Sequence, residues 1–458
     1  MTAVDVAIVG GGASGVILAA HLLRGCDLAA ARLALIDDSG RFGRGVAYGT
    51  DCPHHLLNVP AGRMSAWPDD PLHFLRWAQQ RDASVGPHDF LPRPLYGAYL
   101  QALLADASRG DGRLRLVVDR AVGLRPGDGG GVELWLASGE RLASRRVVLA
   151  LGNAAPGAGV LPDARFAESR RYVSSAWSAA ALADLRGDES MLLLGSGLTA
   201  VDVVAELAAR RHAGTVHAVS RHGLLPAAHG DGPIEPAAAV VGAGRGVGEA
   251  LRALRVAARA AMARGEEWRG VFDGVRPVTQ AVWRAWSADS RRQFLRHARA
   301  FWDVHRHRVA PRVAGLLEEW LSAGRLVVHA GRLRAVVEAG AGAEATVVPR
   351  GGGAERVLRV ERVINCTGPA TDVARSADPL VRSLVAGGLM VADGLGLGPS
   401  VDVNGALIGR GGAASAEIFA IGPLCRAEAW ECTAVPDIRV AAAELAERLA
   451  AKSRTVGA

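Results

Sequence analysis

The sequence contains one arrangement twice: a short apolar run, a glycine-rich turn, and an apolar segment with helical spacing. The first copy, residues 5–23, contains Gly10-Gly-Gly-Ala-Ser-Gly15, and the second, residues 191–208, contains Gly195-Ser-Gly-Leu-Thr-Ala200. Where such a turn joins a strand to a helix, its first glycine permits a tight bend and its second lets the backbone approach a phosphate. The small third position lets the helix pack on the strand, and the helix N-terminus offers free N–H groups to an anion. Two copies predict an α/β fold with two dinucleotide-binding domains.

The residue that ends the next strand differs between the two copies. Asp37 follows the expected strand 32–36, 22 positions after Gly15, near the spacing at which a carboxylate accepts a hydrogen bond from a ribose hydroxyl. In the second copy the strand 215–219 ends in Ser220 and Arg221. A guanidinium pairs with a 2′-phosphate that a carboxylate would repel, so Arg221 favours NADPH over NADH. The alternative for Arg221 is a solvated side chain at a strand end.

Composition argues against several other classes. The chain of 458 residues has 53 basic and 46 acidic residues, but its only lysine is Lys452, so no lysine is available for a P-loop or an internal Schiff base. The arginines are spread over the whole chain and only 5% of residues are aromatic, which favours a compositional bias over nucleic-acid binding. Five cysteines without a C-x-x-C pair argue against a dithiol redox centre or a zinc ribbon.

No segment has the pattern of a membrane span or a secretion signal. The apolar residues near the N-terminus follow Asp5 and are interrupted by the glycine cluster, and no uncharged apolar run of about 20 residues occurs elsewhere. We therefore expect a soluble cytoplasmic protein without membrane or nucleic-acid partners. A homo-oligomer is compatible with the sequence.

The histidines near residue 305 do not predict a metal site. His305 and His307 lie two positions apart on a helix expected over residues 290–309, and such side chains point about 200° apart. They cannot both face one ion, so no metal is expected there or elsewhere in the chain.

Two dinucleotide-binding units in one chain are typical of flavoproteins in which one domain holds FAD and the other admits the nicotinamide that reduces it. The site nearer the N-terminus normally takes FAD. Residues 146–156 and 362–369 each contain an apolar strand that ends at a glycine, Gly152 in the first and Gly368 in the second. They resemble the hinge strands at which such chains cross between domains. Residues 418–423 resemble the segment that closes over the ribityl chain of FAD, with Pro423 where an acid is usual.

These features predict a glutathione-reductase-like flavoprotein architecture of two Rossmann-like domains. We expect a discontinuous FAD-binding domain over residues 1–160 and 360–458. The NAD(P)H-binding domain is expected over residues 161–359, with a helical insertion at about 223–322 that is rich in tryptophan and arginine.

Several blocks of sequence resemble the FAD/NAD(P)-binding proteins that are distantly related to flavin-containing monooxygenases, a family that includes N-hydroxylating members. The blocks are residues 41–49, 55–65, 303–308, 363–369 and 430–439, so the resemblance spans almost the whole chain. One departure concerns the F-x-G-x-x-x-H-x-x-x-F/W fingerprint of flavin monooxygenases. The corresponding stretch, residues 170–177, has no histidine, although Trp177 retains the terminal aromatic residue. This argues against close kinship to the sulfur-oxidising and Baeyer–Villiger members.

The resemblance implies an NADPH-dependent FAD monooxygenase. In such enzymes NADPH reduces the flavin, O2 adds at its C4a position, and the hydroperoxyflavin oxygenates a small-molecule substrate, N-oxidation of an amino group being one case. The flavin carries the chemistry, so no catalytic side chain is singled out. Two alternatives stay open: an FAD-dependent NAD(P)H reductase or dehydrogenase that passes electrons to another acceptor, and a flavin-binding regulatory protein with little turnover.

Candidate site residues follow from these assignments. Asn58, Met64 and Ser65 follow the first β–α unit, where relatives bring a loop to the flavin ring, although turn packing around Pro60 explains them equally well. Val122 lies where such folds stack adenine, and Trp430, Thr433 and Ala434 lie where a helix N-terminus meets the pyrimidine end of the flavin. The full set of predicted FAD contacts is Gly10, Gly12, Ser14, Gly15, Asp37, Asn58, Met64, Ser65, Val122, Gly152, Gly422, Pro423, Trp430, Thr433 and Ala434.

The second nucleotide and the substrate have their own candidates. The predicted NADPH contacts are Gly195, Ser196, Gly197, Thr199, Ala200, Ser220 and Arg221. Trp302, His297 and Arg308, all in the insertion, are candidates for a substrate cleft above the flavin. Core packing for the tryptophan and solvation for the other two are the alternatives.

Overall fold

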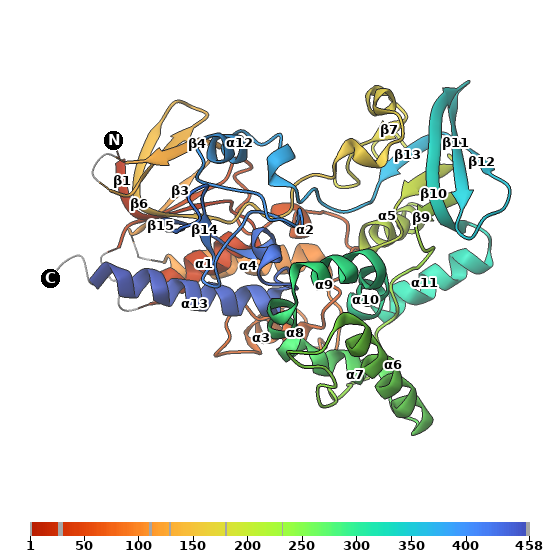
Figure 1. The fold of residues 1–458 in the computed structure, drawn as a ribbon, viewed down its shortest axis with the longest axis horizontal. Helices are drawn as coiled ribbons and strands as arrows, with labels where there is room; N and C mark the ends of the chain where they lie inside the picture. The colour runs from red at the N-terminus through yellow and green to blue at the C-terminus, as the bar shows by residue number, and fades with distance from the viewer. Residues whose placement is uncertain are drawn as a thin grey trace.

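A computed structural model describes residues 2–25, 31–109, 112–127, 130–178, 181–230 and 232–454. It contains two separate sheets at opposite ends of the molecule, with helices packed against both (Figure 1). Among the described residues no helix is both long and apolar enough to cross a bilayer.

The first sheet is built around the N-terminal strand and has the order β14-β15-β6-β1-β2-β3. β1 pairs in parallel with β2 and β6, β2 with β3, and β6 with β15, whereas β14 is antiparallel to β15. Strands β4 and β5 form a hairpin that joins this sheet through β6. The strands are β1 Thr2–Val9, β2 Leu33–Ile36, β3 Leu114–Val117, β4 Ala121–Pro126, β5 Val132–Leu136, β6 Arg141–Leu149, β14 Ala406–Ile408 and β15 Ala414–Ala420.

The second sheet has the order β12-β11-β10-β9-β8-β13-β7. Its part from β7 to β10 is parallel, and β10, β11 and β12 continue it as an antiparallel meander. Gly351, Gly352 and Gly353 lie in the turn between β11 and β12. The strands are β7 Tyr172–Val173, β8 Met191–Leu194, β9 Val216–Ser220, β10 Leu326–Ala339, β11 Gly342–Pro349, β12 Arg356–Val360 and β13 Arg362–Asn365.

Helices cover the sheets and fill the space between them. Those outside the insertion are α1 Ala13–Arg24, α2 Gly45–Tyr48, α3 His73–Gln79, α4 Arg93–Ala107, α5 Leu198–Ala209, α12 Pro379–Ala386 and α13 Val435–Arg454. The helices between β9 and β10 are α6 Val247–Ala263, α7 Trp268–Val275, α8 Thr279–Ala285, α9 Ala288–Gln293, α10 Arg299–Arg306 and α11 Pro311–Ser322. Short 3₁₀ turns are Ala61–Arg63, Ala158–Val160, Ala164–Glu168, Arg276–Val278, Val373–Arg375 and Gly422–Ala427.

The apolar pattern of β1 explains how the first sheet is covered on both faces. Val6 and Ile8 belong to a core shared with α1, α4 and α13, whereas Ala7 and Val9 belong to a core under the β4–β5 hairpin and α12. Alternate residues of a strand point to opposite faces, so each set is buried separately. Helix α1 is apolar on most sides, and the side chains of residues 16–20 are fully buried, because the helix lies between the sheet, α4 and α13.

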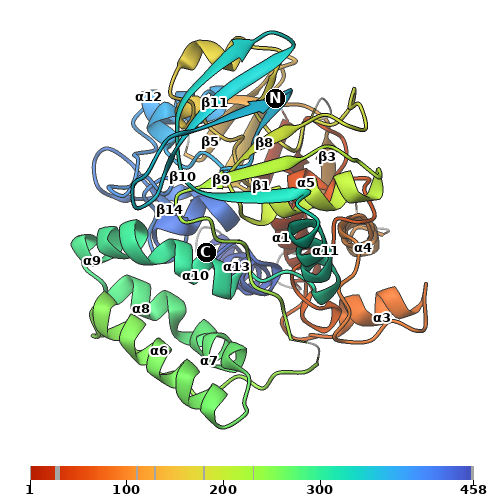
Figure 2. The same cartoon turned by 90° about the vertical axis from the view of Figure 1, so that its right-hand side faces the viewer.

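The insertion is helical, as expected, but differs in one detail. Figure 2 shows its helices α6 to α9 as a layer below the second sheet. The single helix expected over residues 290–309 is divided by a π-helical segment at Phe294–Ala298 and ends at Arg306. It stops there because Val309 turns into a parallel bridge with Ala228, exchanging backbone hydrogen bonds of 2.9 Å with Ala227 and His229.

The predicted fold class is confirmed: each glycine-rich turn lies between a strand and a helix of its own parallel sheet. The strands of the first sheet come from residues 2–149 and 406–420, and those of the second from residues 172–365. The boundaries of the two domains stay a prediction.

Candidate active site

The first glycine-rich turn joins β1 to α1 and has the geometry of a phosphate cradle. Gly10 has φ +109°, a conformation that favours glycine, and a Cβ there would collide with the carbonyl oxygen of Ala150 at the end of β6. Gly12 is the N-cap of α1, and a Cβ on it would have only the Gly45 Cα within 4 Å, at 3.7 Å. Gly15 packs directly on the carbonyl of Gly10. The open space at Gly12 and the free N–H groups of α1 fit a pyrophosphate.

The second turn, between β8 and α5, repeats this geometry. Gly195 has φ +110°, and a Cβ there would lie 2.6 Å from the carbonyl oxygen of Cys366, just after β13. Gly197 is the N-cap of α5 and has open space where a Cβ would be. Ala150 and Cys366 thus occupy equivalent places after the neighbouring parallel strand. Both turns fit a dinucleotide on the same structural grounds.

Several polar side chains around the two turns form hydrogen bonds that stabilise the turns themselves. Asp37 Oδ2 accepts a hydrogen bond of 2.7 Å from the N–H of Gly11, and its Oδ1 accepts one of 3.0 Å from the N–H of Ser39. The Ser196 hydroxyl lies 2.6 Å from the carbonyl of Leu224 and 2.8 Å from the Ser220 hydroxyl. These contacts fix the turns, and the roles of the residues toward a ribose or phosphate stay predictions.

Arg221 differs from these residues because it is exposed at the end of β9. No ion pair joins it to another described residue. Its guanidinium is therefore accessible, and its role toward a 2′-phosphate stays a prediction.

A charged cavity lies where three parts of the chain meet. The loop after α2 contributes Asn58, the residues before α13 contribute Thr433 and Ala434, and the insertion contributes the rest of one wall. Including its opening to solvent, the cavity contains about 500 Å³ of empty space. Its lining residues are Asn58, Val59, Pro60, Arg63, His229, Asp273, Arg276, Arg306, His307, Arg308, Glu431, Thr433, Ala434 and Asp437.

Ion pairs join the insertion to the segment before and within α13. Arg306 Nε lies 3.0 Å from Glu431, and Arg276 lies 2.8 Å from Asp437. The indole N–H of Trp302 also donates to Glu431, at 2.8 Å. Glu431 has φ +67°, a conformation rare for a side chain of its size, and these two contacts hold it there. The wall of the cavity is therefore fixed by partly buried charge pairs.

Arg308 is the most unusual group in the cavity. It is only 2% exposed, and one of its nitrogens, Nη2, lies 2.5 Å from Asp273. Its Nε and Nη1 are buried without a hydrogen-bond partner. Burial lowers the pKa of this guanidinium from its ordinary value, but an arginine keeps its charge at neutral pH. Unpaired buried donors are costly, so these two nitrogens are suited to a negatively charged ligand.

His229 is a neutral group on the same cavity. Burial and the nearby Arg308 lower its pKa to about 4, and its Nε2 lies 3.0 Å from the carbonyl oxygen of Asn58. The neutral imidazole donates its Nε2 proton to that carbonyl and so links the chain after β9 to the loop that carries Asn58.

This histidine predicts a loss of stability in acid. In the unfolded chain His229 takes up a proton near its ordinary pKa of 6.5, whereas in the folded chain it stays neutral until about 4. The free energy of unfolding should therefore fall as the pH falls through this interval, by up to roughly 3 kcal/mol from this group. Urea unfolding at neutral pH and at about pH 5 checks the decline. His229→Gln should make it shallower, and an unchanged decline in the variant would contradict the assignment.

The other predicted flavin contacts are placed differently. Met64 is 2% exposed in the core beside α1, and Ser65 is fully buried, its hydroxyl donating to the carbonyl of Asp70 at 2.6 Å. Of the three residues predicted from this loop, only Asn58 lines the cavity. Val122 is half-buried in β4, Gly152 has φ +68° after β6, and Gly422 packs on Ser14 with Pro423 following it.

Trp302 and Trp430 lie in an apolar cluster next to the charged cavity. Trp430 stacks on Trp283 with ring centroids 4.8 Å apart, and both line a second, apolar cavity together with Trp302. His297 is exposed on the π-helical segment and lines neither cavity. The sequence did not single out Asp273, Arg276, Arg306, Glu431 or Asp437. The only signal for part of this set is that blocks 303–308 and 430–439, named in the resemblance, meet here.

Comparisons with known proteins agree with this architecture. Residues 7–154 match the family model described as FAD-NAD(P)-binding. The ornithine N-hydroxylase of Kutzneria sp. 744 superposes with a TM-score of 0.66 at 16% identity, covering 98% of this chain and 100% of that one. No protein of curated function matches the chain by sequence.

Two further solved structures have the same fold. The L-lysine 6-monooxygenase of Pseudomonas syringae gives a TM-score of 0.64 at 18% identity, covering 97% of this chain and 99% of that one. The cadaverine monooxygenase of the desferrioxamine pathway of Erwinia amylovora gives 0.66 at 14% identity, covering 98% and 95%. The predicted cofactor class and fold are thereby confirmed. Residues 7–154 match the FAD-NAD(P)-binding family model, and the chain as a whole has the fold of these three enzymes.

Proposed function

We propose that the protein is an NADPH-dependent FAD monooxygenase that transfers one oxygen atom of O2 to an amino nitrogen of a small substrate. The charged cavity carries this proposal, because it brings the loop after the first nucleotide unit, the start of α13 and the insertion to one place. FAD, when bound, supplies the redox chemistry by accepting hydride from NADPH and activating O2. The fold shared with an ornithine N-hydroxylase and with lysine and cadaverine monooxygenases supports an amino group as the target.

The chain's own residues bind and orient the two nucleotides. In this proposal the N-terminus of α1 binds the pyrophosphate of FAD and that of α5 binds the pyrophosphate of NADPH. Thr433 and Ala434 directly precede α13, whose first N–H groups and positive dipole end stabilise negative charge at the pyrimidine end of the flavin. Asn58, on the same cavity, is assigned to the flavin ring as well.

The insertion keeps water away from the reacting atoms. Its arginines Arg276 and Arg306 are paired with Asp437 and Glu431, so the cavity wall is tied to the segment that meets the flavin. By covering the site on this side, the insertion would limit the unproductive reaction of activated oxygen with water.

Arg308 is assigned to substrate binding. Its Nε and Nη1 have no hydrogen-bond partner, whereas Asp273 holds Nη2 of the guanidinium in place. A carboxylate on the substrate would accept a charge-assisted hydrogen bond from one of these donors. We therefore expect an amino compound that also carries a negative charge.

The function is tested by following both oxygen and electrons. The flavin-loaded protein is supplied with NADPH, ¹⁸O2 and a panel of amino acids, each paired with the amine that lacks its carboxylate. Substrate-dependent NADPH oxidation with one ¹⁸O atom in the product is the expected result. NADPH oxidation that yields only peroxide, or electrons passed to a dye without oxygen in any product, would favour the reductase. Flavin that NADPH does not reduce would favour a regulatory protein.

The preference for NADPH should depend on Arg221. Arg221→Ala removes the cation assigned to the 2′-phosphate and should lower kcat/KM for NADPH by roughly 10- to 100-fold, with little change for NADH. Steady-state kinetics with both nucleotides checks the ratio. Arg332→Ala, another exposed arginine in the same sheet, is the matched control. An unchanged ratio in Arg221→Ala would remove the assignment.

A further inference from the structure

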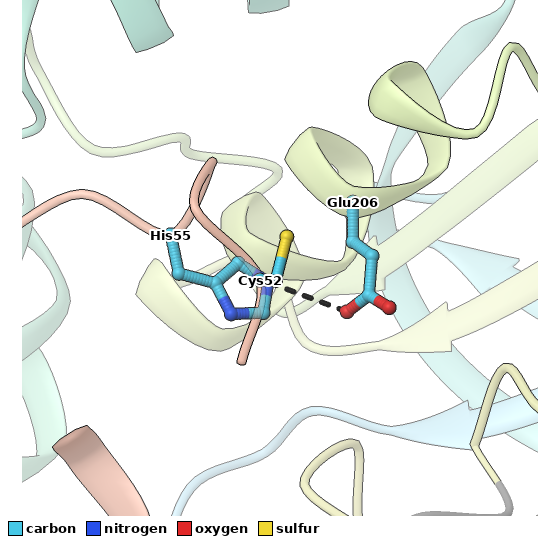
Figure 3. Close-up of side chains that lie close together, drawn as sticks. All are labelled: Cys52, His55 and Glu206. Carbon is cyan, nitrogen blue, oxygen red and sulfur yellow. Dashed lines mark ion pairs between the residues drawn. The ribbon is translucent and has the colours of Figure 1, made fainter. Parts of the chain in front are cut away.

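A second group of side chains with ligand chemistry lies away from the charged cavity. Cys52 and His55 are on the loop after α2, and Glu206 is on α5, the helix of the second nucleotide unit. One thiol sulfur, one imidazole nitrogen and one carboxylate oxygen all lie within 4.8 Å of one another. Figure 3 shows the three side chains converging from the loop and the helix. We call them the Cys–His–Glu cluster.

The imidazole of His55 is already oriented as a ligand. Its Nδ1 lies 2.8 Å from the Thr50 hydroxyl, and its Nε2 lies 3.4 Å from Glu206 Oε2. The Thr50 hydroxyl oxygen also accepts a hydrogen bond of 3.2 Å from the N–H of Cys52. Metal-binding histidines typically have their second ring nitrogen held by such a partner, which fixes the tautomer and the plane of the ring. Thr50 therefore positions two of the three groups at once.

The spacing and chemistry of the donors suit one ion. Zinc bonds of about 2.0–2.3 Å in a tetrahedron place neighbouring donors about 3.3–3.8 Å apart. The 3.4 Å between the imidazole and the carboxylate already falls in this range. All three donor atoms lie within 4.8 Å of one another, so shifts of at most about 1 Å bring every pair within the same spacing. Thiolate, imidazole and carboxylate are the zinc ligands of proteins, and three of them leave a fourth position for water.

The surroundings can accommodate the charge of the ion. His55 is buried, and a metal binds the neutral form of an imidazole. Without an ion, Nε2 donates to the carbonyl of Asp202, 3.1 Å away. The nearby Arg93 is neutralised by Asp202, whose Oδ2 lies 2.9 Å from Arg93 Nη1. Arg210 Nη2 lies 2.5 Å from Glu206 Oε1, the carboxylate oxygen that is not the one near His55. A thiolate and the Glu206 carboxylate then balance a divalent ion, and half-buried Cys52 gives it access from solvent.

We propose that Cys52, His55 and Glu206 bind one divalent transition-metal ion, Zn²⁺ in preference to Mg²⁺ or Ca²⁺. Binding releases the thiol proton to solvent and moves the imidazole proton from Nε2 to Nδ1, so that the ring stays neutral and no oxidation state changes. Because the ligands come from the loop after the first nucleotide unit and from the helix of the second, the ion links the two units. Metal binding at the cluster does not depend on the oxygenase activity.

The site is tested on the untagged, flavin-loaded protein. After dialysis against a chelator and addition of Zn²⁺, elemental analysis should find one bound zinc per chain, with a higher thermal unfolding midpoint. Co²⁺ in place of Zn²⁺ should give tetrahedral absorption bands at wavelengths beyond those of the flavin. Cys52→Ser and Glu206→Gln should each abolish the stoichiometric zinc, and Thr50→Ala should weaken it about 10- to 100-fold.

Controls separate this site from other zinc binding. Cys425→Ser removes a half-buried thiol that donates to the carbonyl of Ala420, away from the cluster, and should keep the zinc and the Co²⁺ bands. Zinc that stays in Cys52→Ser, or no bound zinc in the wild type at micromolar free metal, would overturn the proposal. If Cys52→Ser does not fold, protection of the wild-type Cys52 thiol from alkylation by added Zn²⁺ decides the question, and unprotected Cys52 counts against the site.

Discussion

Gly10→Ala and Gly195→Ala are expected to impair two different steps: the first FAD binding, and the second the reduction of the bound flavin by NADPH. Gly10→Ala should yield protein with little or no FAD, because a Cβ at φ +109° would strike the carbonyl oxygen of Ala150 and displace the turn before α1. Gly195→Ala should keep the yellow flavin but lose its reduction by NADPH, because the Cβ would lie 2.6 Å from the carbonyl oxygen of Cys366. In each case we expect a loss of at least roughly 100-fold in nucleotide affinity, about 2.7 kcal/mol.

The measurements are flavin content after purification and the rate of anaerobic flavin reduction by NADPH. Gly139→Ala is the matched control: Gly139 has φ +90° in an exposed turn, with open space where the Cβ would be. It carries the backbone strain without the collision, so it should retain both FAD and its reduction by NADPH. If both glycine variants lose flavin equally, or if Gly195→Ala is reduced normally, the assignment of FAD to the first turn and NADPH to the second is wrong.

The two nucleotide turns could be predicted because their chemistry is local in sequence. The bend at Gly10, the N-cap at Gly12 and the close packing at Gly15 all occur within six residues, and the same holds from Gly195 to Ala200. The contact that fixes the first glycine is not local, however. Ala150 and Cys366 lie far from their glycines in the chain, and only the pairing of β1 with β6 and of β8 with β13 brings them there.

In the loop after α2, position in the sequence did not distinguish the residue that lines the cavity from those that are buried in the core. Asn58, Met64 and Ser65 were expected to share one surface, but the 3₁₀ turn at Ala61–Arg63 directs the chain back into the core. Asn58 therefore reaches the cavity while Met64 packs with the apolar residues beside α1. A hydrophobic methionine gains more free energy in that core than at a polar edge, and the sequence carries no mark of where the turn occurs.

Neither the charged cavity nor the Cys–His–Glu cluster is visible in any local pattern. Arg276 pairs with Asp437 across 161 positions, and Trp302 donates to Glu431 across 129. Cys52 and His55 lie three apart, too common a spacing to predict a metal, and Glu206 joins them only because α5 packs on their loop. Such sites depend on how two units are packed together, which neither composition nor periodicity encodes.

Arg308→Ala is expected to have the largest effect on substrate selection. Arg308 lines the cavity and its Nε and Nη1 have no partner, so a substrate carboxylate gains a charge-assisted hydrogen bond from it and loses that bond in the variant. Loss of one partner of a buried charge pair typically costs about 2–5 kcal/mol. We therefore expect kcat/KM for a carboxylate-bearing amino compound to fall by roughly 100- to 1,000-fold, mainly through KM. The same compound without its carboxylate should change little.

Two variants separate this role from a structural one. Arg308→Ala leaves Asp273 buried without its cation, which destabilises the fold, and Arg308→Ala/Asp273→Asn relieves that cost. If Arg308 binds the carboxylate, the double variant should regain stability against urea but not kcat/KM, and added guanidinium should restore part of the activity. Arg296→Ala, an exposed arginine of the same insertion, is the control and should change neither. An equal fall in kcat/KM for substrates with and without the carboxylate would assign Arg308 to the fold alone, because a purely structural defect cannot distinguish the two.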